Sequence, residues 1–168
     1  MSNTTLTLGT FSKDASGQCS GYGVYYFQNV KGIQFSGSAS LISVCNFIYL
    51  DNKSGSFQFS TSGSVDIEAP TSGTYKGVAY YQSKPGLPLP ANFKRQYALT
   101  LSGGSSLKVY GTVYVPHDEC NLSGSSGATD IHGQFICDTI SLSGSSTLTV
   151  KWNPALVWNP GATPSPTP

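Results

Sequence analysis

The turn sequence Leu-Ser-Gly occurs three times in the second half of the chain, in Leu101-Ser-Gly-Gly-Ser-Ser-Leu107, Leu122-Ser-Gly-Ser-Ser-Gly127 and Leu142-Ser-Gly-Ser-Ser-Thr-Leu148. Each is an apolar residue followed by a small polar turn and usually by a second apolar residue, and two earlier segments have the same order. They are Phe35-Ser-Gly-Ser-Ala-Ser-Leu41 and Phe59-Ser-Thr-Ser-Gly-Ser-Val65. The five segments start 24, 42, 21 and 20 residues apart, and the spacing of 42 contains an insertion. A turn that returns about every twenty residues indicates an internal repeat.

A second series of segments alternates with the first, and each consists of a glycine followed by a short apolar stretch. Its members are Gly23-Val-Tyr-Tyr-Phe27, Gly77-Val-Ala-Tyr-Tyr81, Gly111-Thr-Val-Tyr-Val115 and Gly133-Gln-Phe-Ile-Cys137. The segment Cys45-Asn-Phe-Ile-Tyr49 has the same character without the glycine. Glycine and serine are common at tight corners, where positive φ or close backbone approach is needed.

Together the two series predict an all-β protein, a single-stranded right-handed parallel β-solenoid (β-helix) with about 20–24 residues per coil. Apolar residues alternate inward, as in Leu99-Thr-Leu101, and stacked coils bury them in one continuous core. Like residues then form ladders from coil to coil. An antiparallel sandwich also has short alternating strands, but it does not require the same turn to return at a fixed spacing.

The coils are expected to occupy residues 1–158, with an inserted surface loop near 82–97. Residues 151–158 are expected to cap the last coil through Trp152 and Trp158, since an open coil exposes strand edges and core. The proline-rich stretch 159–168 is expected to be a linker or tail.

The low content of charged residues restricts the kinds of partner that the protein can bind. Charged residues make up 10% of the 168 residues, hydrophobic residues 38%, and the net charge is +1. Polyanion binding needs clustered lysine and arginine, but the densest cluster here is Lys94-Arg95, so we expect no nucleic-acid partner.

Four cysteines, in a chain poor in charge, indicate disulfides and an oxidising compartment. Four cysteines allow three connectivities. The favoured pairs are Cys19–Cys45 and Cys120–Cys137, because each pair lies about one coil apart. The alternatives are four buried free thiols or, less favoured because no C-x-x-C pair occurs, a zinc site.

Acidic and histidine residues provide the candidates for chemistry. Asp66 and Glu68 lie two apart on a strand and share a face, where they either bind a cation or form a solvated outer face. His117, Asp118 and Asp138 are weak metal candidates, because stacking brings neighbouring coils together. Without a recognised ligand spacing or catalytic motif, we expect no cofactor, no metal and no catalytic residue.

Residues 77–150 resemble a known family. The matching segments are Gly77-Val-Ala-Tyr80, Leu99-Thr-Leu-Ser-Gly-Gly-Ser105, Gly111-Thr-Val-Tyr-Val-Pro116, Leu122-Ser-Gly-Ser-Ser126, Ile136-Cys-Asp-Thr-Ile140 and Leu142-Ser-Gly-Ser-Ser146. This pattern is similar to the C-terminal region of bacterial envelope proteins related to the TadG type of tight-adherence pilus-assembly proteins. The resemblance implies an extracytoplasmic β-rich domain, a membrane segment upstream and no catalytic residues.

The sequence thus predicts a non-enzymatic extracytoplasmic module, at the cell surface or secreted, that acts in adhesion or pilus-type envelope assembly. Its partner would be an envelope or pilus protein or a surface polysaccharide, contacted through Tyr80, Tyr81, Phe93 and Tyr97. We expect an anchor or secretion signal upstream; the alternative is a cytosolic protein that begins at Met1. The second hypothesis is a polysaccharide-binding or carbohydrate-active β-helix. The third is ice binding, which requires outward ranks of threonine.

Overall fold

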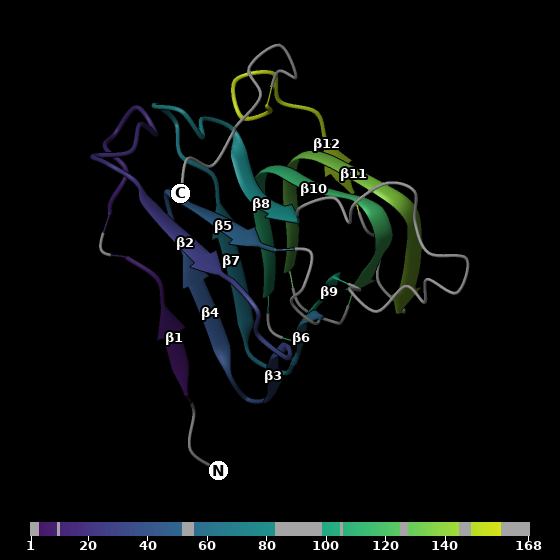
Figure 1. Ribbon diagram of the computed structural model, residues 1–168. Helices are drawn as coiled ribbons and strands as arrows, with labels where there is room; N and C mark the ends of the chain where they lie inside the picture. The colour runs from purple at the N-terminus through teal and green to yellow at the C-terminus, as the bar shows by residue number, and fades with distance from the viewer. Residues whose placement is uncertain are drawn as a thin grey trace.

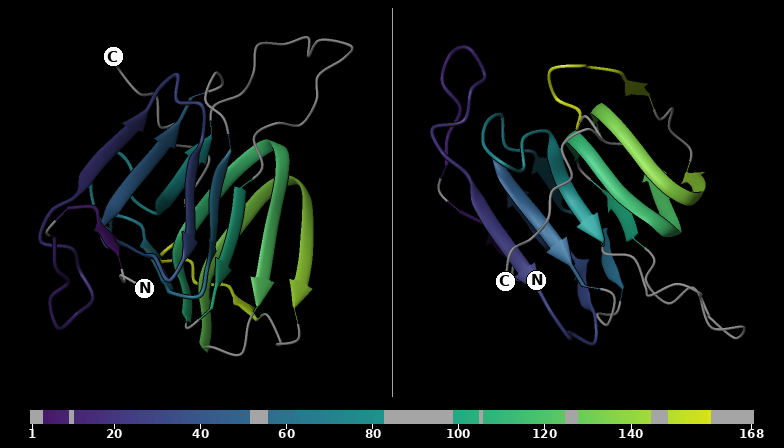
Figure 2. Two further views of the ribbon diagram at one scale, coloured as in Figure 1. Left: turned by 90° about the horizontal axis from the view of Figure 1, so that it is seen from below. Right: turned by 45° about the horizontal axis from the view of Figure 1, so that its top comes forward.

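The computed structural model describes residues 4–9, 11–51, 56–82, 99–104, 106–124, 128–144 and 149–158. In these residues the protein is all-β and its strands form one curled parallel sheet (Figures 1 and 2). The described residues contain no helix long and apolar enough to cross a membrane. Every strand pair within the described ranges is parallel, and the one antiparallel contact found there is an isolated bridge between Lys13 and Cys19.

The strands fall into three rows. The first row contains β1 (Thr5–Thr7), β4 (Ser40–Ser43), β7 (Ser64–Glu68) and β12 (Val150–Lys151). The second contains β2 (Gly23–Phe27), β5 (Asn46–Leu50) and β8 (Val78–Gln82), and the third β3 (Ile33–Gly37), β6 (Phe57–Thr61) and β9 (Leu99–Gly103). Two long bent strands, β10 (Ser106–Gly124) and β11 (Ala128–Gly144), pass through all three rows. The chain therefore visits the rows in turn.

The repeated turn segments pair with one another, which confirms the ladders expected from the sequence. In the third row the paired residues are, in order, Phe35, Phe59, Leu101, Leu122 and Leu142. These are the first residues of the five turn segments. The loop expected near residues 82–97 lies in the spacing of 42. Gln82 belongs to β8, and residues 83–98 lie outside the described part of the chain.

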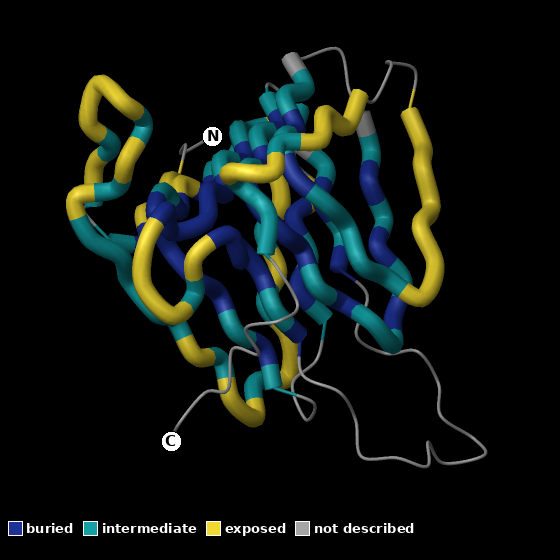
Figure 3. Tube along the Cα trace, turned by 90° about the horizontal axis from the view of Figure 1, so that it is seen from above, coloured by how far each residue is buried: buried dark blue, intermediate teal, exposed yellow. Residues whose placement is uncertain are grey.

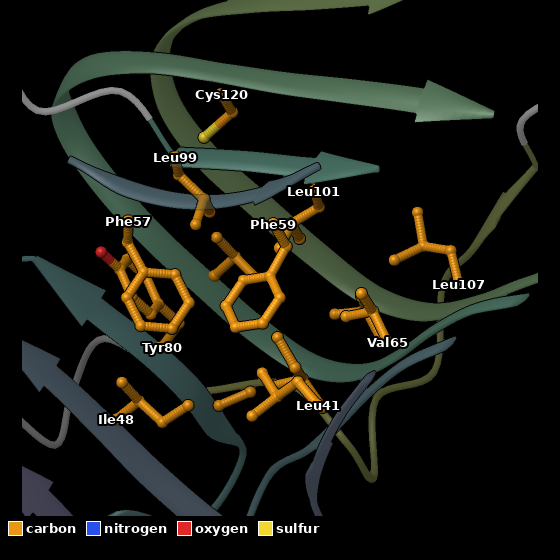
Figure 4. Close-up of a cluster of buried hydrophobic side chains, with 14 of the residues drawn as sticks. Leu41, Ile48, Phe57, Phe59, Val65, Tyr80, Leu99, Leu101, Leu107 and Cys120 are labelled. Carbon is orange, nitrogen blue, oxygen red and sulfur yellow. The ribbon is translucent and has the colours of Figure 1, made fainter. Parts of the chain in front are cut away.

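Inward-facing apolar residues form one core (Figures 3 and 4). Phe57, Phe59, Leu99 and Leu101 lie in it with at most 2% of their surface exposed, and Val65 comes from the first row. Stacking is direct: the rings of Phe35 and Phe59 lie parallel with centroids 4.2 Å apart. Burial at alternate positions is what the period-two pattern of the turn segments predicted.

The glycine that begins each member of the second series lies at a corner between the first and second rows. Gly77 and Gly111 have φ of 77° and 124°, and Gly111 pairs with Gly133. Gly23 pairs with Asn46, the residue after Cys45, and Cys45 also has positive φ, 60°. The segment without a glycine thus adopts the corner conformation with a cysteine in it.

Both predicted disulfides are present, Cys19–Cys45 and Cys120–Cys137, with Cα atoms 5.8 and 6.0 Å apart. The first connects the loop of residues 11–22 to the corner at Cys45. The second joins β10 to β11 beside the shift in their register. Disulfides of this kind are typical of oxidising compartments.

Removing the first disulfide is expected to lower the free energy of unfolding by about 3 kcal/mol, because the cross-link restricts the unfolded chain. Residue 45 adds a second effect. Cys19→Ser combined with Cys45→Gly should be about 1 kcal/mol more stable than Cys19→Ser combined with Cys45→Ser, since glycine adopts positive φ without strain. Urea unfolding of the two double variants measures the difference. Equal stability would show that Cys45 carries no backbone strain.

The end of the fold at β11 exposes apolar side chains. Trp152 is 65% exposed, and Trp158 packs edge-on against Tyr114 on the outer side of the second row, with ring centroids 5.6 Å apart. Neither tryptophan therefore covers the core as the expected cap would. An apolar cleft of about 280 Å³ opens there, lined by Leu122, Phe135, Ile140, Leu142 and Val150.

Candidate functional site

The aromatic residues expected to contact a partner lie in different environments. Tyr80 is 1% exposed and faces the core, where burial raises the pKa of its hydroxyl. Tyr81, its neighbour, faces outward and is half-buried. Phe93 and Tyr97 lie outside the described residues. Tyr81 is therefore the one described member of this set that lies on the outer surface.

Tyr81 belongs to a ladder of tyrosines on the outer side of the second row. Tyr26, Tyr49, Tyr81 and Tyr114 pair in succession, and the rings of Tyr49, Tyr81 and Tyr114 are stacked with centroids 5.8 and 4.9 Å apart. Burial raises the pKa of Tyr26 to about 12, and its hydroxyl bonds to that of Tyr75. Because the stacked rings turn their faces toward one another, this ladder stabilises the sheet rather than offering ring faces to a sugar.

The outer side of the third row is uncharged along its centre. Its main ladder consists of serines: Ser36, Ser60, Ser102, Ser123 and Ser143. Thr100 pairs with Asn121 and Thr139 with Glu119, while Thr112 is buried. Threonines therefore do not stack on threonines at these positions, and the ranks required for ice binding do not form within the described residues.

The outer side of the first row carries a cluster of charged residues at equivalent positions of successive repeats. Asp66, Lys108 and Asp130 pair in one line, and Glu68, Tyr110, His132 and Lys151 pair in the next. Charged residues of opposite sign thus lie opposite one another across neighbouring strands, an arrangement that stabilises a sheet.

Asp66 and Glu68 share the outward face, as their spacing predicted. The Glu68 side chain is 3% exposed and forms ion pairs with Lys13 and Lys108. It therefore belongs neither to a solvated face nor to a cation site. Lys108 also lies 3.6 Å from Asp66. The ammonium groups of Lys13 and Lys108 stand over the ring of Tyr110, 5.3 and 4.8 Å from its centroid. The solvated-face interpretation was wrong for Glu68 because lysines from other segments cover it.

The carboxyl groups in this cluster have opposite pKa shifts. Burial, together with the charge of Glu68, raises the pKa of Asp66 to about 6. Burial also acts on Glu68, but hydrogen bonds from Lys108 and Lys13 outweigh it and lower its pKa. A hydrogen bond from Tyr110 lowers the pKa of Asp130 and raises that of Tyr110 to about 12. The tyrosine therefore donates to a charged carboxylate.

These shifts predict how stability depends on pH. The folded-state pKa of Asp66 lies above its ordinary value, so folding favours the protonated carboxyl group. The stability that this group contributes is fully present below pH 3.8 and is lost as the pH rises to about 6. Asp66→Asn should therefore be more stable than the parent chain above pH 6, by about 1–2 kcal/mol after allowance for solvent screening. Urea unfolding of both proteins across this pH range tests the expectation. A variant that is less stable above pH 6 would show that the charged Asp66 stabilises the fold.

The weak metal candidates do not come together as a site. Asp118 is 2% exposed and accepts a hydrogen bond of 3.3 Å from Gln82, His117 is half-buried, and Asp138 is exposed. Within the described ranges there is no group of three histidine, cysteine or acidic residues that could hold a metal ion.

A cleft of about 320 Å³ lies next to the charged cluster. It is lined by Lys13, Ser16, Gly17, Gln18, Thr71, Lys76, Tyr110, Asn153, Ala155 and Leu156. These residues come from the loop 11–22, the turn 71–77, β10 and the C-terminal turn. Figure 1 shows the loop, the turn and the C-terminal segment along the top of the view, in purple, teal and yellow. The cleft thus joins segments that are far apart in the sequence.

Sequence reasoning missed this cleft and the lysines that pair with Glu68. The first-row cluster left a signal, because Asp66-x-Glu68, Lys108-x-Tyr110 and Asp130-x-His132 follow their turn segments at equivalent positions. Aligning the repeats beyond the turns would have revealed it. The sequence around Lys13 contains no comparable pattern, since Lys13 lies outside the repeat.

Comparison with known proteins returned no match: none with a protein-family model, none with a curated protein and none with a solved structure.

Proposed function

We propose that the chain is a right-handed β-solenoid with coils of about 20–24 residues, and that it acts outside the cytoplasm as a non-enzymatic structural or adhesive module. The observation that carries this proposal is the pairing of the repeated segments in three rows. Stacked repeats form a stiff scaffold with extended outer surfaces, which are typical binding surfaces. The two disulfides support a location at the cell surface or in the secreted fraction.

A non-enzymatic role is supported by the state of the carboxylates. A glycosidase needs one carboxyl group that donates a proton and a second that acts as base or nucleophile, both facing the substrate. Glu68 is instead buried beneath Lys13 and Lys108, and Asp130 accepts hydrogen bonds from Tyr110 and His132. Carboxylates used in this way stabilise the sheet.

The proposed partners are an envelope or pilus protein, as in the TadG-type proteins that the sequence resembles, or a surface polysaccharide. Polysaccharide binding is the second candidate function, and the cleft beside Tyr110 favours it, since it brings amide, hydroxyl and ammonium groups together.

Retention assays test the proposal. The protein is immobilised and incubated with bacterial envelope preparations and with neutral and acidic polysaccharides, and bound material and newly released reducing ends are measured. We expect material to be retained and no reducing ends to be released. Release of reducing ends that is abolished by Asp66→Asn would contradict a non-enzymatic role. Retention no greater than on a urea-unfolded sample would contradict an adhesive one.

A further inference from the structure

The cleft beside Tyr110 has a one-sided distribution of charge. Two lysines, Lys13 and Lys76, line it, and no aspartate or glutamate is among its lining residues. Lys13 forms an ion pair with Glu68. Lys76 is exposed and pairs with no carboxylate within the described chain. An ammonium group is therefore available at the rim for a negatively charged ligand.

The carboxylate of Asp14, next to Lys13 in the sequence, forms hydrogen bonds within its own loop. Its Oδ1 accepts hydrogen bonds from the backbone amides of Ser16 and Gln18, at 2.8 and 2.9 Å, and from the Ser16 hydroxyl at 2.6 Å. These bonds lower the pKa of Asp14, the first among them the side-chain bond from Ser16. Asp14 thus shapes the wall of the cleft without lining it.

The wall formed by the loop 11–22 is held in place before any ligand arrives. Cys19 is disulfide-bonded to Cys45, and its backbone amide donates to Thr71 Oγ1 at 2.8 Å. Lys13 and Cys19 form a β-bridge across the loop. In the C-terminal turn, which also lines the cleft, Asn153 Oδ1 accepts a hydrogen bond from the amide of Ala155 at 3.0 Å. A preorganised cleft loses less conformational entropy on binding.

The remaining lining groups suit a sugar. Gln18 and Asn153 carry amides and Leu156 adds an apolar surface, while the hydroxyls of Ser16 and Thr71 already bond to Asp14 and to the amide of Cys19. Amides and hydroxyls bond to sugar hydroxyls, while apolar and aromatic surfaces contact the C–H face of a ring. A cleft of about 320 Å³ lies at the small end of the range of about 300–1,000 Å³ for ligand sites, so it fits a short saccharide unit rather than a large ligand.

We propose that this cleft binds a carboxylate-bearing sugar unit of a surface polysaccharide, with the carboxylate at Lys76 and the sugar hydroxyls at Gln18 and Asn153. This inference rests on the proposed adhesive function, and it names the partner class and the site. The rigid wall, the cationic rim and the absence of lining carboxylates among the described residues support the same ligand chemistry.

The test compares tetragalacturonate with its fully methyl-esterified form, in which each carboxylate is replaced by an uncharged methyl ester. Binding is measured by calorimetry and by shifts of the amide NMR signals of Gln18, Lys76 and Asn153. We expect tetragalacturonate to bind, Lys76→Met to weaken binding about tenfold, and the ester to bind about as weakly as the variant does. Lys31→Met, which removes an exposed lysine that does not line the cleft, should leave binding unchanged.

Three results would overturn the proposal: no signal shifts at the cleft, equal binding of acid and ester, or equal loss in Lys76→Met and Lys31→Met. Competition with inorganic phosphate is a further test. If an equal concentration of phosphate displaces tetragalacturonate, the cleft is a general anion site and not a sugar site. Failure here is distinguishable from failure of the adhesive function. If Lys76→Met still retains envelope material, the function stands and the cleft is not its site; if the parent chain retains nothing, the function itself fails.

Discussion

Replacing Gly111 with valine is expected to lower the free energy of unfolding by about 3–5 kcal/mol, a large fraction of the roughly 5–15 kcal/mol that stabilises a typical domain. Gly111 has φ of 124°, a conformation that a β-branched residue does not readily adopt. A Cβ there would lie 2.5 Å from the Cβ of Ala69 and 3.3 Å from the backbone oxygen of Gly77. Strain and overlap therefore add at this corner.

Gly37→Ala separates these two causes. Gly37 also has positive φ, 68°, but a Cβ there would meet no atom within 4 Å. We expect a loss of only about 1 kcal/mol from strain alone. Urea unfolding gives both values. If Gly111→Val costs no more than Gly37→Ala, the corner at Gly111 is not closely packed against Ala69 and Gly77.

Phe59→Ala is the second change with a large expected effect, a loss of about 3–5 kcal/mol. Phe59 is fully buried, and its ring lies 4.2 Å from that of Phe35 and 4.9 Å from that of Phe57, measured between centroids. Removing the ring leaves a cavity in the middle of the third-row ladder. The free energy of unfolding in urea measures the cost.

Ser60→Ala is the matched control, because the next residue faces outward and is exposed. A surface substitution of this kind is expected to change stability by no more than about 0.5 kcal/mol. A cost at Ser60 as large as that at Phe59 would mean that the two faces of β6 are assigned the wrong way round.

The repeat made the stacking of the turn segments and both disulfides predictable, whereas the division into three rows came from the structure. Phe35, Phe59 and Leu101 begin similar segments, and these segments pair with one another because each repeat buries its apolar residues against the next. The same logic placed Cys19 near Cys45 and Cys120 near Cys137. Pairing every position, rather than the turns alone, would also have aligned Asp66 with Lys108.

Other features depend on information that a repeat does not contain. Tyr80 and Tyr81 are neighbours on one strand, so only one of them faces outward, and the corner at Gly77 sets which one. Trp158 packs on Tyr114 because the terminal segment folds across the outer surface, not over the end. The cleft requires Lys13, Lys76 and Asn153 from three segments outside the repeat, which only the tertiary structure brings together.

The central claim is that successive repeats stack in parallel and in register, and the third-row serines test it most directly. Ser36 is replaced with a spin-labelled cysteine, together with one of Ser102, Ser123 or Ser143, while the native cysteines remain in their disulfides. Electron–electron distances are then measured. Neighbouring strands lie about 4.8 Å apart, so the separation should rise by about that amount at each step and reach about 19 Å for Ser36 and Ser143. Separations that do not rise in this order would contradict the stacked arrangement.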